Sequence, residues 1–218
     1  MIDRMERAVR AGTLCLGLMG AAFMASGAPV VDDLASGITA ADVRQTAQQA
    51  LHSGDASGKP FAVVDKKQAR IYVFDAEGRL AGTAPVLLGL AKGDGSAPGV
   101  ASRISTGIPA NERTTPAGRF EAEPGHNIKG EAIVWVDYAA AIAIHRLRPA
   151  PAAERRPQRL ASDKPEDRRI SLGCIVVAPE FYDAVIATTL GRQRGVVYVL
   201  PDGESAPALA AGASTQQL

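Results

Sequence analysis

From Lys59 onward the chain consists of short segments rich in β-branched and aromatic residues, separated by turn residues every few positions. This pattern predicts strands, because such side chains pack well on a pleated surface. Only the stretch from Pro179 to Leu190 is typical of a full helix, since proline suits the first helical turn. Many short strands with one principal helix predict a mainly β domain, a sandwich or a barrel. The expected strands are 61–65, 69–75, 80–90, 133–138, 141–145, 173–177 and 195–200.

A length of 218 residues suits one domain with appendages. We expect the domain to occupy residues 59–201, after a linker at 29–58 that holds a short helix ending near His52. Glycine, serine and proline make 91–118 a loop. The polar, alanine-rich segment 202–218 is expected to be a disordered tail.

The first 28 residues have the parts of a secretory signal. Three arginines, at 4, 7 and 10, precede an uncharged run that ends in the small residues 26–28. The alternative is a membrane anchor, because residues 11–31 carry no charge, although this run is only weakly apolar. Either reading places the rest of the chain outside the cytoplasm, and we expect a periplasmic protein.

Cysteine usage points to one reactive group. Cys15 lies inside the expected signal, so Cys174 is the single thiol of the mature chain. In an oxidising compartment an unpaired cysteine is either buried as a small core residue or kept for its reactivity.

Two neighbouring features favour reactivity at Cys174. Gly173 precedes it, which lets a substrate approach and lets backbone N–H groups converge on a developing oxyanion. His145 closes an apolar strand, where it would project from the sheet as a base. The pattern predicts a thiol nucleophile with a histidine base.

These residues resemble the L,D-transpeptidases with a YkuD-type catalytic domain. The family signature is a histidine closing a strand, then a loop, then Ser-x-Gly-Cys, which here is His145 followed by 171–174. The segment 114–120, Thr-Thr-Pro-Ala-Gly-Arg-Phe, is similar to the family's Thr-Pro-x-Gly-x-Phe turn. The resemblance covers about 61–201 and implies a β-sandwich of mixed sheets with one principal helix after the cysteine strand.

The resemblance also implies a cysteine acyltransferase of cell-wall biogenesis. The Cys174 thiolate would attack a tetrapeptide stem of peptidoglycan, release D-alanine and leave a thioester. A second stem, a protein amine or water would resolve it. The oxyanion would lie near the Gly173 and Cys174 N–H groups. Ser171 is either a hydrogen-bond partner near His145 or a structural turn residue, and a backbone carbonyl is expected to orient His145 in place of an acidic side chain.

The chain departs from the family pattern at three places. Leu172 stands where many members have histidine, and Val176 where Arg or Asn is usual. We therefore expect a weakened but active enzyme, in which Val176→Asn or Val176→Arg speeds acylation. The third departure is a long loop, 146–169, with eight basic residues, four acidic residues and four prolines. It is either a solvated excursion or a lid that helps to hold an anionic stem.

Other chemistries find little support. The three histidines and the one mature cysteine lack metal-ligand spacing, so no metal and no cofactor are expected. A net charge of +1 does not indicate nucleic acid. The membrane becomes a partner only if the signal is uncleaved. The main alternative function is a catalytically silent peptidoglycan-binding module with the same fold, distinguished by the reactivity of Cys174.

Overall fold

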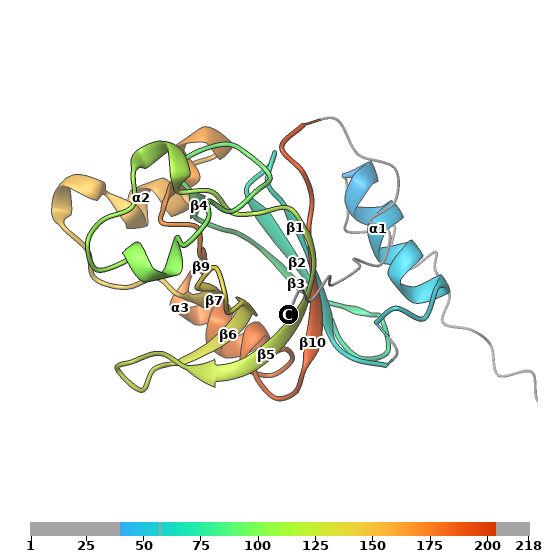
Figure 1. Ribbon diagram of the computed structural model, residues 1–218. Coiled ribbons are helices and arrows are strands. Elements are labelled where there is room, and N and C mark those ends of the chain that lie inside the picture. The colour runs from blue at the N-terminus through green and yellow to red at the C-terminus, as the bar shows by residue number, and fades with distance from the viewer. Residues whose placement is uncertain (1–39, 57, 204–218) are drawn as a thin grey trace, which may run out of the picture.

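The computed structural model describes residues 40–56 and 58–203, and its centre is one curved sheet of eight strands (Figure 1). The strand order is β3-β2-β1-β10-β5-β6-β7-β9, and β4 pairs separately with β8. The prediction of a mainly β chain with few helices is confirmed. The strands are β1 Phe61–Asp65, β2 Arg70–Phe74, β3 Leu80–Pro85, β4 Leu88–Gly89, β5 Gly118–His126, β6 Ala132–Asp137, β7 Ile142–Arg146, β8 Arg169–Ser171, β9 Ile175–Val177 and β10 Gly195–Val199.

The helices are short and lie around this sheet. In the described residues the longest is α1, which begins at Ala41 and ends at His52, as the sequence predicts. The expected helix after the cysteine strand is observed as a short α3 that continues in π geometry as η6. None of the helices in 40–56 and 58–203 has both the length and the apolar character needed to span a membrane. The others are α2 Arg156–Ala161, α3 Pro179–Phe181, η2 Ala101–Arg103, η3 Ala110–Glu112, η4 Ala152–Glu154, η5 Pro165–Arg168 and η6 Tyr182–Ile186.

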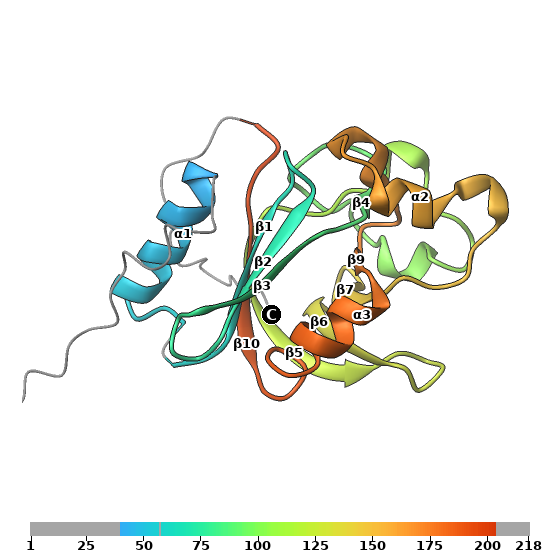
Figure 2. The ribbon, with the colours of Figure 1, turned by 180° about the vertical axis from the view of Figure 1, so that it is seen from behind.

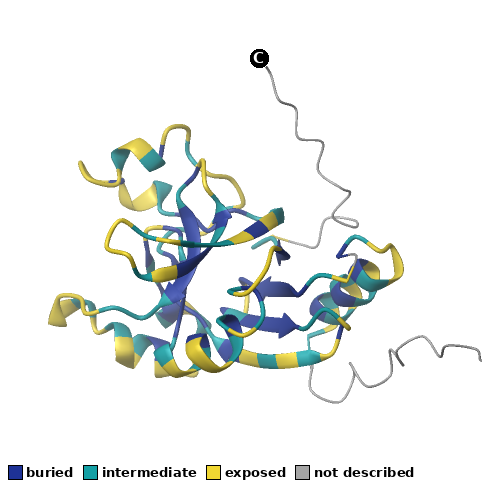
Figure 3. Cartoon of the chain, turned by 90° about the horizontal axis from the view of Figure 1, so that it is seen from below, coloured by how far each residue is buried: buried dark blue, intermediate teal, exposed yellow. Residues whose placement is uncertain are grey.

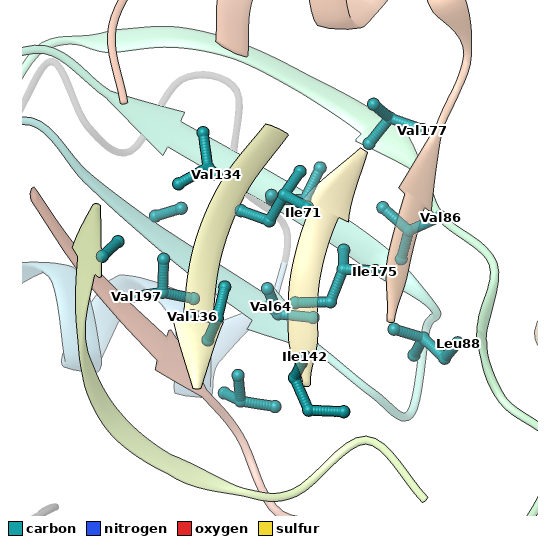
Figure 4. Packing of buried hydrophobic residues seen from close by; sticks show 14 of the residues in the cluster. Val64, Ile71, Val86, Leu88, Val134, Val136, Ile142, Ile175, Val177 and Val197 are labelled. Atoms are coloured by element: carbon teal, nitrogen blue, oxygen red, sulfur yellow. The ribbon is translucent and has the colours of Figure 1, made fainter. Parts of the chain in front are cut away.

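The sheet curls until its two ends meet. Leu87, just after the edge strand β3, exchanges two backbone hydrogen bonds with Val176 of β9, at 2.8 and 2.9 Å. The curl brings β1 and β2 opposite β6, β7 and β9, and valine and isoleucine side chains fill the space between them (Figure 4). Because strand residues alternate between faces, each strand contributes every second side chain to this core.

A second cluster lies on the opposite face of β1, β2 and β10. Helix α1 packs there through Val43, Ala47 and Ala50, against the stacked rings of Phe61 and Phe74. Figures 1 and 2 show α1 and α3 on opposite sides of the sheet. Strand β1 is therefore buried on both faces, in agreement with its apolar sequence. The buried residues of the chain gather on the strands, and the exposed ones on the loops and helices around them (Figure 3).

The structure differs from the sequence predictions at two strands and at one terminus. The nine-residue β5 and the short β8 were not expected, because Pro124 and Gly125 interrupt the apolar pattern of β5. Asp202, the first residue of the expected tail, is held by Arg169 and by Lys66. The expected signal at 1–28 lies outside the described residues, as do residues 204–218 of the tail.

Candidate functional site

Cys174 lies at the turn between β8 and β9, and two buried residues shape this turn. Gly173 has φ +136°, and a Cβ there would lie 2.7 Å from the carbonyl oxygen of Thr114, so a side chain would not fit. The Thr115 hydroxyl donates to the Gly173 carbonyl at 2.8 Å and accepts the Gly89 N–H at 2.9 Å. The segment 114–120, which resembles the family's Thr-Pro turn, therefore holds the cysteine turn in place through the Thr115 hydroxyl.

Ser171 is engaged with the backbone of the same turn. Its hydroxyl donates to the Cys174 carbonyl at 2.7 Å and accepts the Gly173 N–H at 3.1 Å. Of the two readings of Ser171, this geometry favours the structural one. It also changes the expected oxyanion site, because the Gly173 N–H is occupied and only the Cys174 N–H remains of the expected pair.

His145 and Cys174 lie on the same face of the sheet. Strands β7 and β9 are parallel, with His145 opposite Val176 and Ile144 opposite Ile175. Opposite residues point to the same side and alternate along each strand, so Cys174, two residues before Val176, shares the face of His145. The pairing thus puts two residues that are 29 positions apart on one face of the sheet, while Ile144 and Ile175 point into the central core.

The imidazole of His145 has a defined tautomer. Its Nδ1 lies 2.7 Å from the carbonyl oxygen of Arg146, and a carbonyl can only accept. Nδ1 therefore carries the proton, and the lone pair is on Nε2, where a base needs it. A backbone carbonyl orients this ring, as expected.

Burial sets the charge of both groups. Desolvation lowers the pKa of His145 to about 4, although the Arg146 carbonyl opposes the shift. Desolvation likewise raises the pKa of the Cys174 thiol, and a backbone hydrogen bond from Ala143 and then the charge of Arg148 partly offset this rise. At neutral pH the pair is thus a thiol and a neutral imidazole rather than a thiolate–imidazolium pair. The Cys174 Sγ lies 3.5 Å from the carbonyl oxygen of Ala141, its hydrogen-bond acceptor.

The loop 146–169 is anchored to the sheet at a few buried residues, while much of it is exposed. We call residues 147–168, between β7 and β8, the insert. Its helix α2 buries Leu160 against Leu87 and Val176. Arg168, at the end of the insert, is buried and donates to the carbonyl of Gln68 at 3.1 Å. The insert therefore covers Val176, on the face of the sheet that carries His145 and Cys174.

Val176 belongs to this covered face. It is 1% exposed, in contact with Leu87 and Leu160. This burial argues against the expectation that Asn or Arg at this position speeds acylation, because a polar side chain would be buried among leucines without partners. The sequence pattern could not show this, since the covering leucine comes from a helix inside the long loop.

Three residues near the thiol were missed as site residues. Thr115 supports the turn, Ala141 accepts from the thiol, and Arg148 brings a positive charge near the pair. Thr115 lay within the quoted motif, and Arg148 stands three residues after the histidine, but nothing local marked either. Tyr138, in the turn after β6, is exposed with its ring edge-on to Trp135. Among the described residues no cluster could hold a metal ion.

Comparison with known proteins gives fold neighbours only. No family model and no curated protein matches the chain. Among solved structures, it is similar to the helical cell shape determining protein Pgp2 from Campylobacter jejuni, with 16% identity and a TM-score of 0.43. The match covers 67% of this chain and 49% of that one.

Two further neighbours are L,D-transpeptidases by name. For the one from Mycobacterium smegmatis the identity is 17% and the TM-score 0.37, and the match covers 65% of this chain and 58% of that one. For the one from Xylanimonas cellulosilytica the values are 16% and 0.40, with 70% of this chain and 68% of that one covered. The chain thus spans about half the length of the first neighbours. At such identities, residue roles rest on this chain's own geometry.

Proposed function

We propose that this chain is a peptidoglycan L,D-transpeptidase that acts outside the cytoplasm through a Cys174 thioester. The observation that carries the proposal is the shared face of Cys174 and His145, with Nδ1 of the ring bound to the Arg146 carbonyl. A nucleophile and an oriented base on one face of a sheet support acyl transfer, in which the base takes the proton of the nucleophile. The sequence resemblance supplies the substrate, a tetrapeptide stem.

The chemistry follows from neutral reactants. Nε2 of His145 takes the Cys174 proton as the sulfur attacks the carbonyl carbon of the third stem residue. The oxyanion accepts the Cys174 N–H, and the C–N bond to the terminal D-alanine breaks. The imidazolium returns its proton to the leaving amine, which leaves a thioester. An acceptor amine then forms the new amide, giving its proton to His145, while the thiol is regenerated; water in its place gives hydrolysis.

Mass spectrometry of the purified protein with tetrapeptide muropeptides tests this proposal. We expect an acyl-enzyme adduct on Cys174, smaller than the added peptide by one D-alanine. His145→Gln should slow the formation of this adduct by about 10²–10⁴-fold, the usual contribution of a general base. Carbapenem β-lactams, which are strained amides, should acylate the same thiol. Wild-type protein that forms no adduct with either reagent would refute the proposal.

A silent peptidoglycan-binding module is the second candidate, and the raised pKa of the Cys174 thiol favours it. The rate of alkylation by iodoacetamide near neutral pH separates the two. A transpeptidase should lose rate when His145 is replaced, because the neutral ring assists deprotonation. In a silent module the same replacement leaves the slow rate unchanged.

Export is part of the proposal and has its own test. We expect a mature protein that begins between Ala28 and Asp32, and N-terminal sequencing of the periplasmic fraction measures this. Full-length chain extracted only by detergent would indicate an anchor instead of a cleaved signal.

A further inference from the structure

The insert forms an open groove beside the candidate site. Its volume is about 380 Å³, and it is lined by residues 147–152 and 155–158. Three arginines, Arg148, Arg155 and Arg156, line it, and none of its described lining residues is acidic. Three prolines stiffen the same walls, so little backbone freedom is lost when a ligand binds.

The groove continues the sheet face that carries Cys174. Its first lining residue, Leu147, donates its N–H to the Val177 carbonyl at 2.7 Å, which extends the pairing of β7 with β9 by one residue. Leu147 and Cys174 both pack against the cluster around Val176. Leu147 therefore links the groove to the apolar cluster against which Cys174 packs.

The charges of the groove are only partly neutralised. Arg148 pairs with Glu131 at 2.7 Å, and Arg156 pairs with Glu154. Arg155 is exposed and forms no ion pair with any described residue. The three guanidinium groups thus exceed their carboxylate partners by one, and this excess lies at Arg155.

We propose that this groove is the subsite that binds a carboxylate of the peptide donor other than the C-terminal one, with Arg155 as its principal ligand and Arg156 beside it. The proposal rests on the proposed function, because the donor is the peptide that acylates Cys174. A guanidinium presents paired N–H donors that match the two oxygens of a carboxylate. The groove therefore selects donors by charge at a site separate from the reacting carbonyl.

Two peptides and two variants test the subsite in the full chain. One peptide is the tetrapeptide with free carboxylates; the other has amides in place of every carboxylate except the C-terminal one. The rate of thioester formation is measured against peptide concentration for wild type, Arg155→Gln and Arg156→Gln. Glutamine keeps the Cβ of Arg155, whose φ is +48°, so the backbone at this position is equally strained in the variant.

We expect Arg155→Gln to raise the apparent KM for the free-carboxylate peptide by about tenfold, since one charge-assisted hydrogen bond contributes roughly that factor. The apparent KM for the amidated peptide should change less than twofold in this variant. The rate of alkylation by iodoacetamide should also change less than twofold. Arg192 is an exposed arginine on the loop before β10, and Arg192→Gln is the matched control. It should leave the apparent KM for both peptides unchanged. Equal effects of Arg155→Gln on both peptides, or no effect on either, would overturn the subsite.

Binding to a Cys174→Ala variant separates the subsite from the chemistry. Calorimetry should show the free-carboxylate peptide binding about tenfold more tightly than the amidated one, with the difference lost in Arg155→Gln. If wild type forms no thioester while this preference persists, the proposed function fails and the subsite stands. If both peptides bind equally, the subsite fails whatever the chemistry does.

Discussion

At the scale of single residues, the burial of His145 makes stability depend on pH. The pKa of its ring is about 4 in the folded chain and about 6.5 when exposed. The unfolded chain therefore binds the extra proton, and stability falls as the pH is lowered from about 6.5 to 4. The full loss is up to about 3 kcal/mol. Urea unfolding at several pH values measures it.

His145→Gln should remove this part of the pH dependence, because glutamine does not titrate. Acidic groups such as Asp202, whose pKa lies below the ordinary 3.8, affect stability at lower pH than His145 does. Their stabilisation is present above pH 3.8 and is lost as the pH falls further. His52→Gln, at an exposed position, is the control and should keep the slope. An unchanged slope in His145→Gln would contradict the assignment.

The Thr115 hydroxyl gives a second prediction at this scale. Thr115→Val keeps the shape but leaves the Gly89 N–H and the Gly173 carbonyl without their buried partner. We expect a loss of roughly 1–3 kcal/mol in the free energy of unfolding and slower acylation of Cys174. Thr115→Ser keeps the hydroxyl and should retain most of both. Equal behaviour of the two variants would mean that the hydroxyl has no positioning role.

At the scale of elements, helix α2 determines how well the candidate site is covered. Leu160→Ala leaves a gap over Leu87 and Val176, and such truncations cost about 2–5 kcal/mol in a core. We expect faster alkylation of Cys174 and new proteolytic cleavage within the insert. Leu160→Met keeps the volume and is the control. Unaltered alkylation in Leu160→Ala would show that α2 does not cover the thiol.

The same packing reverses the sequence-based prediction for Val176. Val176→Asn places an amide beneath α2, where leaving it unpaired costs about 1–3 kcal/mol. We expect a lower thermal midpoint and no gain in acylation, with Val176→Ile as an apolar control. A variant that is both stable and faster would restore the original reading of this position.

At the scale of the whole molecule, Lys66 connects three segments that are far apart in the sequence, those of Asp94, Thr115 and Asp202. Its buried ammonium donates to Asp94 at 2.6 Å and to the Thr115 carbonyl at 3.0 Å, and lies 3.3 Å from Asp202. Lys66→Met removes the charge and takes its donor from Asp94 and from the Thr115 carbonyl, while Asp202 keeps Arg169, and we expect a cost of about 3 kcal/mol. Chemical denaturation measures it. Lys67→Met, whose exposed ion pair contributes at most about 1 kcal/mol, is the neighbouring control; equal losses would contradict the role of Lys66.

Local pattern was enough to predict most strands, helix α1 and the candidate pair. β-branched runs mark strands by their own propensity, and a single thiol after a glycine is unusual in an exported chain. Strand β5 was not predicted, because its Pro124 and Gly125 weaken the local strand pattern. Pairing with β10 and β6 stabilises the strand in spite of these residues.

Only the tertiary structure decided what surrounds that pair. Thr115 meets Gly173 across 58 positions, and Leu160 covers Val176 because the insert folds back over β9. Contacts of this kind depend on how the sheet curls and on which face each residue takes, and neither is encoded by neighbours in the chain. The sequence by itself determined the candidate nucleophile and base; burial by the fold decided the direction of their pKa shifts and which neighbouring polar groups are already hydrogen-bonded.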